Sequence, residues 1–421
     1  VDLFDKRNKF LTEQSLAVDT TSLQSEVYGQ DVQRIGWEVS IKKSRSNYRL
    51  ERMKTYDKAL EKNADESKPI GDLCDMESKL HFPTDEKCCF YSFKSNSRQT
   101  PCSFTHFQLR HMIAATSPTD VYYMNDNSIH HWNSITRTTQ QADGKLSNSK
   151  VSMDLRKGKG IVKDLTYMDS EASGILISTL NANYPYLVAG GFKGEIVIMN
   201  LENDGEVIYN NRISHSANSI TNYLDLKGNS LLVSSNDGFV RKFDLPTMDM
   251  ISAVSFDYCI NNSVTQSKNG KLMACIGDTY EVVVCDQEGT PSSMMKLSGH
   301  MDFSFAIDWN PVNEYQFTTG SQDKLVCVWD IRKPTGPVHT IPGIIGAIRS
   351  VRYSEDGQFL ASSEPADFVH VYDVNSEFSR EHVIDIYGEI VGIAFSRNDG
   401  GQSLYIGIYD RHFRSLMELS R

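Results

Sequence analysis

The sequence has few of the features that mark metal-binding, membrane or secreted proteins. Its eight cysteines include no CxxC pair and no histidine at zinc-finger spacing, which weighs against a structural metal site. No apolar run approaches the ~20 residues that a membrane-spanning helix needs, and the first residues do not resemble a secretory signal. The shortage of positive charge, 43 Lys and Arg against 54 Asp and Glu, opposes binding to nucleic acid or to an anionic membrane. We therefore expect a cytoplasmic protein, with the nucleus as a second location.

Motifs for small-molecule chemistry are also missing. There is no Gly-rich phosphate loop, no nucleophile elbow and no cluster of histidines at metal-ligand spacing. These absences predict a protein without a cofactor and without enzymatic activity. Hydrophobic residues make up 39% of the chain and aromatic residues 10%, which is enough for a packed core.

A repeated unit is present instead. The stretch TTGSQDKLVCVWDI at residues 318–331 recurs as LLVSSNDGFVRKFDL, LMACIGDTYEVVVCD and FLASSEPADFVHVYDV, with weaker copies elsewhere. The positions that correspond to Asp330 are Asn133, Asn200, Asp244, Asp286, Asp373 and Met417, and the last six of the seven marks are 42 to 44 residues apart. A period of ~40 to 45 residues with four strands per unit is typical of WD-repeat propeller blades. The fold class is therefore predicted as all-β, a seven-bladed WD-repeat β-propeller.

The N-terminal part differs in character from the repeats. Residues 1–87 are predicted to be a helical and extended extension, and residues 88–421 the propeller. An amphipathic helix that packs on the propeller is expected from Leu50, Met53, Tyr56 and Leu60, which lie at three- and four-residue steps. The apolar segment 88–93 is predicted to close the ring by adding a strand to the last blade, because an unpaired sheet edge would otherwise be left exposed.

Four residues fit the hydrogen-bonded network that stabilises many WD blades: His300, Thr319, Asp323 and Trp329. A histidine beside an aspartate and a hydroxyl could also suggest a hydrolase. The structural interpretation is favoured, since the turn aspartate recurs with the repeat and no strained nucleophile turn accompanies it.

Longer phrases carry a more specific resemblance. DVQRIGWE, LRHMIAATSPTDVYYM, GHMDFSFAIDW, GAIRSVRYSEDGQFLASSEPADFVHVYDV and GIYDRHFRSLMEL together resemble a fungal and plant family of WD-repeat proteins. Within it, the chain looks most like the propeller-type substrate receptor of the yeast GID ubiquitin ligase. The resemblance implies a receptor that binds short N-terminal degrons and docks on a ligase scaffold subunit, while other subunits transfer ubiquitin.

A pocket for a protein N-terminus needs carboxylates, because an ammonium group carries three N–H donors that are costly to bury unpaired. Loop residues that could form it are Asp302, Glu364, Asp367 and Asp410, with walls from Phe192, Phe303, Tyr387 and Tyr409. Each has a structural alternative, such as a turn hydrogen bond for Asp367 or a core position for Phe303. The alternative function is that of a general scaffold, which joins protein partners without recognising a protein N-terminus.

Overall fold

A computed structural model describes residues 33, 35, 37, 42–61, 88–136, 175–202, 205–265, 270–289, 293–411 and 413–421. The strands are β1 Ser92–Ser97, β2 Ile113–Ala115, β3 Asp120–Asn125, β4 Ser128–Asn133, β5 Ile177–Asn183, β6 Tyr186–Gly191, β7 Glu195–Asn200, β8 Glu206–Arg212, β9 Thr221–Lys227, β10 Ser230–Ser235, β11 Phe239–Asp244, β12 Met250–Ser255, β13 Ile260–Thr265, β14 Leu272–Gly277, β15 Glu281–Asp286, β16 Met295–Ser298, β17 Ser304–Trp309, β18 Gln316–Ser321, β19 Leu325–Asp330, β20 His339–Pro342, β21 Ser350–Tyr353, β22 Phe359–Ser363, β23 Ala366–Asp373, β24 Glu381–Phe395, β25 Ser403–Tyr409 and β26 Ser415–Ser420, with helix α2 Arg45–Glu61 and the 3-10 helix η4 Val374–Ser376.

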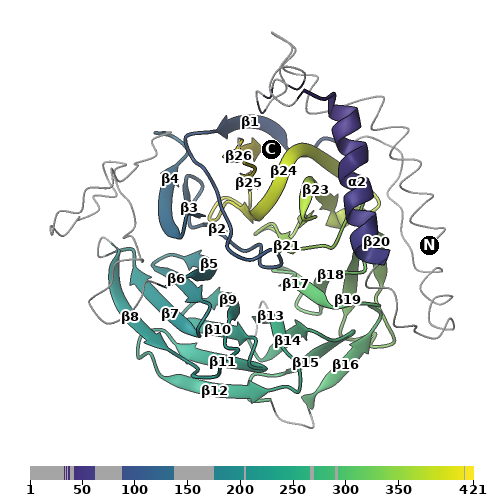
Figure 1. Ribbon diagram of the computed structural model, residues 1–421. Coiled ribbons are helices and arrows are strands. Elements are labelled where there is room, and N and C mark those ends of the chain that lie inside the picture. Colours follow the sequence, from purple (N-terminus) through teal and green to yellow (C-terminus); the bar gives the residue numbers. More distant parts are fainter. Residues whose placement is uncertain are drawn as a thin grey trace.

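The strands form antiparallel blades around a ring (Figure 1). Four sheets have four strands each, and β2, β3 and β4 form a fifth blade. The remaining seven-stranded sheet contains two blades, because β24 pairs with β23 through its first half and with β25 through its second half. The innermost strands β2, β5, β9, β13, β17, β21 and β24 each contact the next, and β2 contacts β24. The ring is therefore closed with seven blades.

Gly388 lies where β24 passes from one blade to the next. Its φ is +122°, and a Cβ at this position would come within 2.7 Å of a methyl group of Ile408. Both observations favour glycine here, because other residues rarely adopt that backbone conformation and no space exists for a side chain. The bend lets one continuous strand serve two blades.

Burial follows position within a blade. All six residues of β19 are buried, whereas the outer strand β12 is largely exposed. Apolar side chains gather between neighbouring blades, as where Val326 and Val328 of β19 pack with Leu360 and Tyr372 of the next blade. A single four-stranded sheet could not cover such faces alone, so the blades depend on one another for their core.

The ring closes through an N-terminal strand of the last blade that overlaps the predicted segment but begins four residues later. The closing strand is β1, Ser92–Ser97, which pairs with β26, so the predicted segment 88–93 overlaps it by only two residues. The apolar residues before the strand have another role: Tyr91 is buried, and Phe90 and Phe93 pack against the core of the last two blades. An outer edge strand faces solvent and tolerates polar residues, which is why hydrophobicity alone placed it too early.

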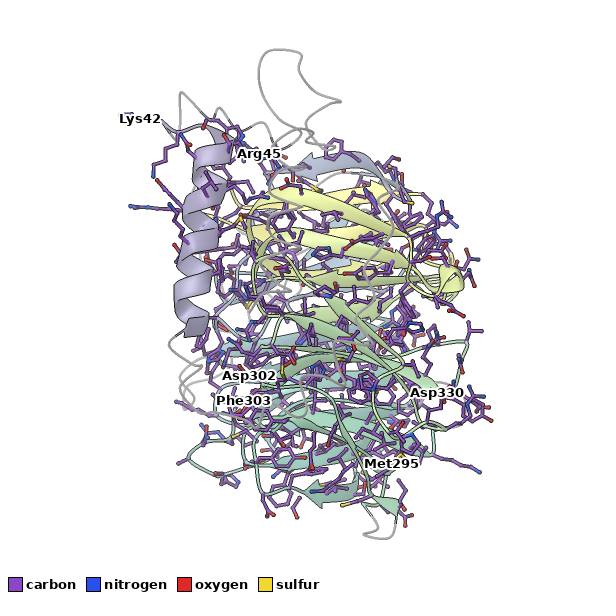
Figure 2. The ribbon with its side chains drawn as sticks, turned by 90° about the vertical axis from the view of Figure 1, so that its right-hand side faces the viewer. Lys42, Arg45, Met295, Asp302, Phe303 and Asp330 are labelled. Carbon is purple, nitrogen blue, oxygen red and sulfur yellow. The ribbon has the colours of Figure 1, made fainter. Side chains whose placement is uncertain are left out.

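Helix α2 lies on one face of the ring, and only part of the predicted apolar stripe docks it there (Figure 2). Met53 and Tyr56 pack against the propeller, whereas Leu50 is 39% exposed. The side chain of Leu60 lies outside the described residues, as do residues 1–32, 34, 36, 38–41 and 62–87. Much of the contact comes from arginines, because the surface beneath the helix presents buried carboxylates.

Candidate functional site

One face of the propeller carries most of the predicted site residues. Asp302 and Phe303 lie on the same side of the ring as α2, and Asp330 lies on the opposite side (Figure 2). We call the side with α2, Asp302 and Phe303 the helix face. The turns between the second and third strands of the blades lie here, as do the links from one blade to the next.

The structure joins the four residues of the predicted network. His300 Nδ1 lies 2.9 Å from Asp323 Oδ2, and His300 Nε2 lies 2.7 Å from Thr319 Oγ1. The indole N–H of Trp329 donates to the same hydroxyl at 2.7 Å. Because His300 and Trp329 are almost completely buried, these bonds tie a turn to the blade core and leave no hydroxyl exposed for nucleophilic attack.

Glu364 is fully buried, and its carboxylate holds a loop of its own chain. It accepts backbone hydrogen bonds from Ile344 and Ile345, both at 2.6 Å, and from Gly346 at 2.7 Å. His370 Nε2 lies 2.9 Å from the same carboxylate. With four partners, the two oxygens are already saturated. Glu364 therefore does not offer a carboxylate to a ligand, contrary to the sequence expectation.

His370 lies between two carboxylates in the interior. Its Nε2 pairs with Glu364, and its Nδ1 lies 2.7 Å from Glu381. Burial by itself lowers the pKa of His370, but the hydrogen bonds and charges of the two glutamates raise it to about 9. The imidazolium compensates two buried negative charges, which would otherwise lower the stability of the fold.

Asp367 is likewise engaged within the protein. It is fully buried at a φ of +68°, and its Oδ1 accepts from the backbone N–H of Gly388 at 3.0 Å. Arg52 and Arg49 of α2 approach its Oδ2 at 3.5 and 3.7 Å. Burial raises the pKa of Asp367 in spite of these two arginines. The carboxylate attracts the helix and is covered by it.

The other charged anchor of α2 is Asp385. Arg49 forms an ion pair with it at 2.5 Å and Arg45 at 3.0 Å. Arg49 also stacks over the ring of Phe368 at 4.3 Å. Since both partners of each pair are mostly buried, these contacts are worth more than exposed salt bridges.

Tyr387 belongs to an aromatic cluster beside the helix. Its ring centroid lies 4.6 Å from Tyr48, 4.9 Å from Trp37 and 6.1 Å from Phe413. Burial and the nearby Asp410 raise the pKa of Tyr387 to about 12. It packs N-terminal segments onto the propeller instead of lining an open wall.

The remaining predicted residues keep some exposure. Asp302 and Asp410 are half-buried, and so are Phe192 and Tyr409. Phe303 is 39% exposed and lies 6.1 Å from Tyr280, centroid to centroid. The four predicted carboxylates thus do not form one pocket: two are used inside the fold and two remain at the surface.

Basic residues near the centre of the helix face were not predicted. Arg110 and Arg349 are both buried, and Arg110 pairs with Glu389 at 2.7 Å. Next to them, His106 has its pKa lowered by burial and by the charges of Arg349 and Arg110. They come from links between blades that are far apart in the sequence, so no local pattern groups them.

A second unpredicted feature is a cavity of about 260 Å³ inside the ring. Its lining includes Tyr223, Asp308 and Arg352 from inner strands. β17 starts at the helix face and ends at Trp309, which also lines the cavity, so the cavity lies toward the opposite face. Burial raises the pKa of Asp308 to about 6, because Arg352 and two backbone N–H groups compensate its charge only in part.

Comparison with known proteins agrees with this architecture. The family described as "WD domain, G-beta repeat" matches residues 291–330, the segment that contains His300 and Trp329. The crystal structure titled "Crystal Structure of Mitotic Checkpoint Complex" contains a chain that superposes with a TM-score of 0.59 at 14% identity, covering 80% of this chain and 99% of that one.

The chain is a WD-repeat β-propeller. Among its curated relatives, histone acetyltransferase type B subunit 2 of Neurospora crassa is 32% identical over 18% of this chain and 19% of its own length. Ribosome biogenesis protein YTM1 of Saccharomyces cerevisiae is 33% identical over 25% of this chain and 24% of its own length. The chain thus matches about a fifth to a quarter of the length of these relatives. The matched segments are about as long as two repeats.

The described part of the chain contains neither a metal-binding cluster nor a membrane-spanning helix. No group of three His, Cys, Asp or Glu side chains there is arranged to hold a metal ion. None of the helices in that part has the length and apolar character that crossing a bilayer requires.

The charge state of His370 gives a prediction about pH. Its pKa of about 9 in the folded protein exceeds the ~6.5 of an unfolded chain, so its charge stabilises the fold fully below pH ~6.5 and progressively less toward pH 9. His370→Gln should therefore lower the free energy of unfolding by about 3 kcal/mol more at pH 6 than at pH 9.5. Urea denaturation at the two pH values measures this difference.

His215→Gln, a change at an exposed histidine, is the control and should leave stability unchanged at both pH values. An equal loss for His370→Gln at pH 6 and pH 9.5 would show that the imidazole is not charged between the glutamates.

Proposed function

We propose that this propeller is a non-catalytic interaction subunit that assembles protein partners through its helix face. The observation that supports the proposal most is the exposed aromatic surface there: Phe107 is 63% exposed and Phe303 39%, with Phe192 and Tyr280 beside them. Exposed aromatic side chains on a rigid body are typical anchors of protein interfaces. The histidines and carboxylates that could have suggested catalysis are occupied within the blades.

The relatives support the same general role. One relative is named as a subunit of a histone acetyltransferase and another as a ribosome biogenesis protein. Each is similar to this chain over the length of about two repeats.

Changing the aromatic surface should release the partners. Phe107→Ser together with Phe303→Ser is expected to weaken partner binding about tenfold or more, because central aromatic anchors dominate interface energies. The measurement is the amount of each stoichiometric partner that co-purifies with the tagged full chain, followed by titration with that purified partner.

Met250→Ser with Ile251→Ser is the matched control, since both residues are 56% exposed on the outer strand β12. Loss of partners from this control but not from the double phenylalanine variant would move the interface to the rim and contradict the proposal.

A narrower proposal is that the helix face receives protein N-termini, as in a substrate receptor of a GID-type ubiquitin ligase docked on its scaffold subunit. It rests on the resemblance of the sequence phrases, together with the half-buried positions of Asp302 and Asp410 beside aromatic residues. Glu364 and Asp367 no longer belong to that pocket, because their oxygens serve the loop and the helix.

The narrower proposal predicts dependence on a free amino group. In an array of peptides presented with free and with acetylated N-termini, only the free forms should bind. Asp302→Asn or Asp410→Asn should then weaken the selected peptide about 30-fold or more, because an ammonium group pairs better with a carboxylate than with an amide. Equal binding of acetylated peptides, or no binding of any, would leave the general scaffold as the better account.

A further inference from the structure

Arg349 is a buried cation with unused hydrogen-bond donors. It precedes β21 on the loop that Glu364 holds, and the residue is only 6% exposed. Its Nη2 donates to the side-chain oxygen of Gln322 at 3.0 Å, and its guanidinium lies 4.1 Å from the centre of the Phe305 ring. Its Nε and Nη1, which carry three of the five N–H donors, have no hydrogen-bond partner in the part of the chain that is described.

The charges around Arg349 do not compensate it. Burial and the positive charge of Arg110 lower its pKa to about 9, outweighing the favourable influence of Tyr56 and Asp302. The carboxylate of Glu389 pairs with Arg110 and not with Arg349. A buried cation without a close anion costs free energy, so the free protein is less stable for carrying it.

The neighbours of Arg349 indicate what could offset that cost. His106 is close enough that Arg349 lowers its pKa, and its ring lies 4.9 Å from exposed Phe107. Phe303, also exposed, lies two residues from Phe305, on which Arg349 stacks. A basic group is thus bordered by aromatic surface on the face already proposed for partners.

We propose that Arg349 binds a carboxylate of an acidic peptide segment in a partner protein, with Phe107 and Phe303 contacting apolar side chains next to that carboxylate. This inference rests on the proposed function and specifies the partner's chemistry. A glutamate fits better than a phosphate group, which carries nearly two charges, because Arg110 already has its own carboxylate and only Arg349 of these two arginines lacks one among the described residues. Nε and Nη1 of Arg349 both lie below the protein surface, so neighbouring side chains must shift before a carboxylate can reach them.

The test uses the full chain and two capped tripeptides, acetyl-Leu-Glu-Leu-amide and acetyl-Leu-Gln-Leu-amide, at equal ionic strength. The Glu peptide at ten times its Kd should raise the melting temperature by about 2 °C, and the Gln peptide should not. Arg349→Gln should remove this response and melt no lower than the native chain without peptide. Arg332→Gln removes one exposed charge next to Asp330, on the opposite face, and should respond like the native chain.

Three results would overturn the proposal. They are an equal response of the native chain and Arg349→Gln, a lower melting temperature of Arg349→Gln without peptide, and a larger response to inorganic phosphate than to the Glu peptide. Partner release by the phenylalanine variants is measured separately, so failure here leaves the proposed function standing.

Discussion

The helix face depends on a single buried carboxylate. Glu364 receives three consecutive backbone N–H groups from Ile344 to Gly346 and a fourth hydrogen bond from His370. An anion with no exposed surface is stable only when such partners surround it, so the position of the loop and the charge of the glutamate require each other. The same loop leads to Arg349 and supplies the apolar platform of Ile344 and Ile345 on which α2 packs.

Negative charge in the interior also explains how the N-terminal helix is held. Asp367 and Asp385 lie under α2, and three arginines spaced along one side of the helix approach them. The acidic propeller thus recruits a basic segment of its own chain. At the centre of the same face the sign is reversed, since Arg349 and Arg110 lie together there.

The repeat could be predicted from the sequence because it depends on local pattern. A spacing of 42 to 44 residues over the last six marks and a recurring turn aspartate indicated both the propeller and the contacts of His300 and Trp329. The use of Glu364 and Asp367 could not be predicted, because their partners come from another loop and from a helix more than 300 residues away. The same reason hid Arg349, whose neighbours come from parts of the chain that are far apart in the sequence: the link before β2 (Arg110), strand β17 (Phe305) and the turn between β18 and β19 (Gln322). Leu50 was placed on the wrong side of α2 because arginines, not apolar residues, carry much of that contact.

Hydrogen–deuterium exchange in Glu364→Gln tests the central claim most directly. Replacing the carboxylate by an amide keeps its size but removes the charge that the three N–H groups and His370 share. Amides of Ile344 to Gly346 and of α2 should then exchange about tenfold faster or more, while β17 to β19 keep their protection. Unchanged exchange in that loop and helix, or an equal loss of protection in all blades, would contradict the view that Glu364 organises this face.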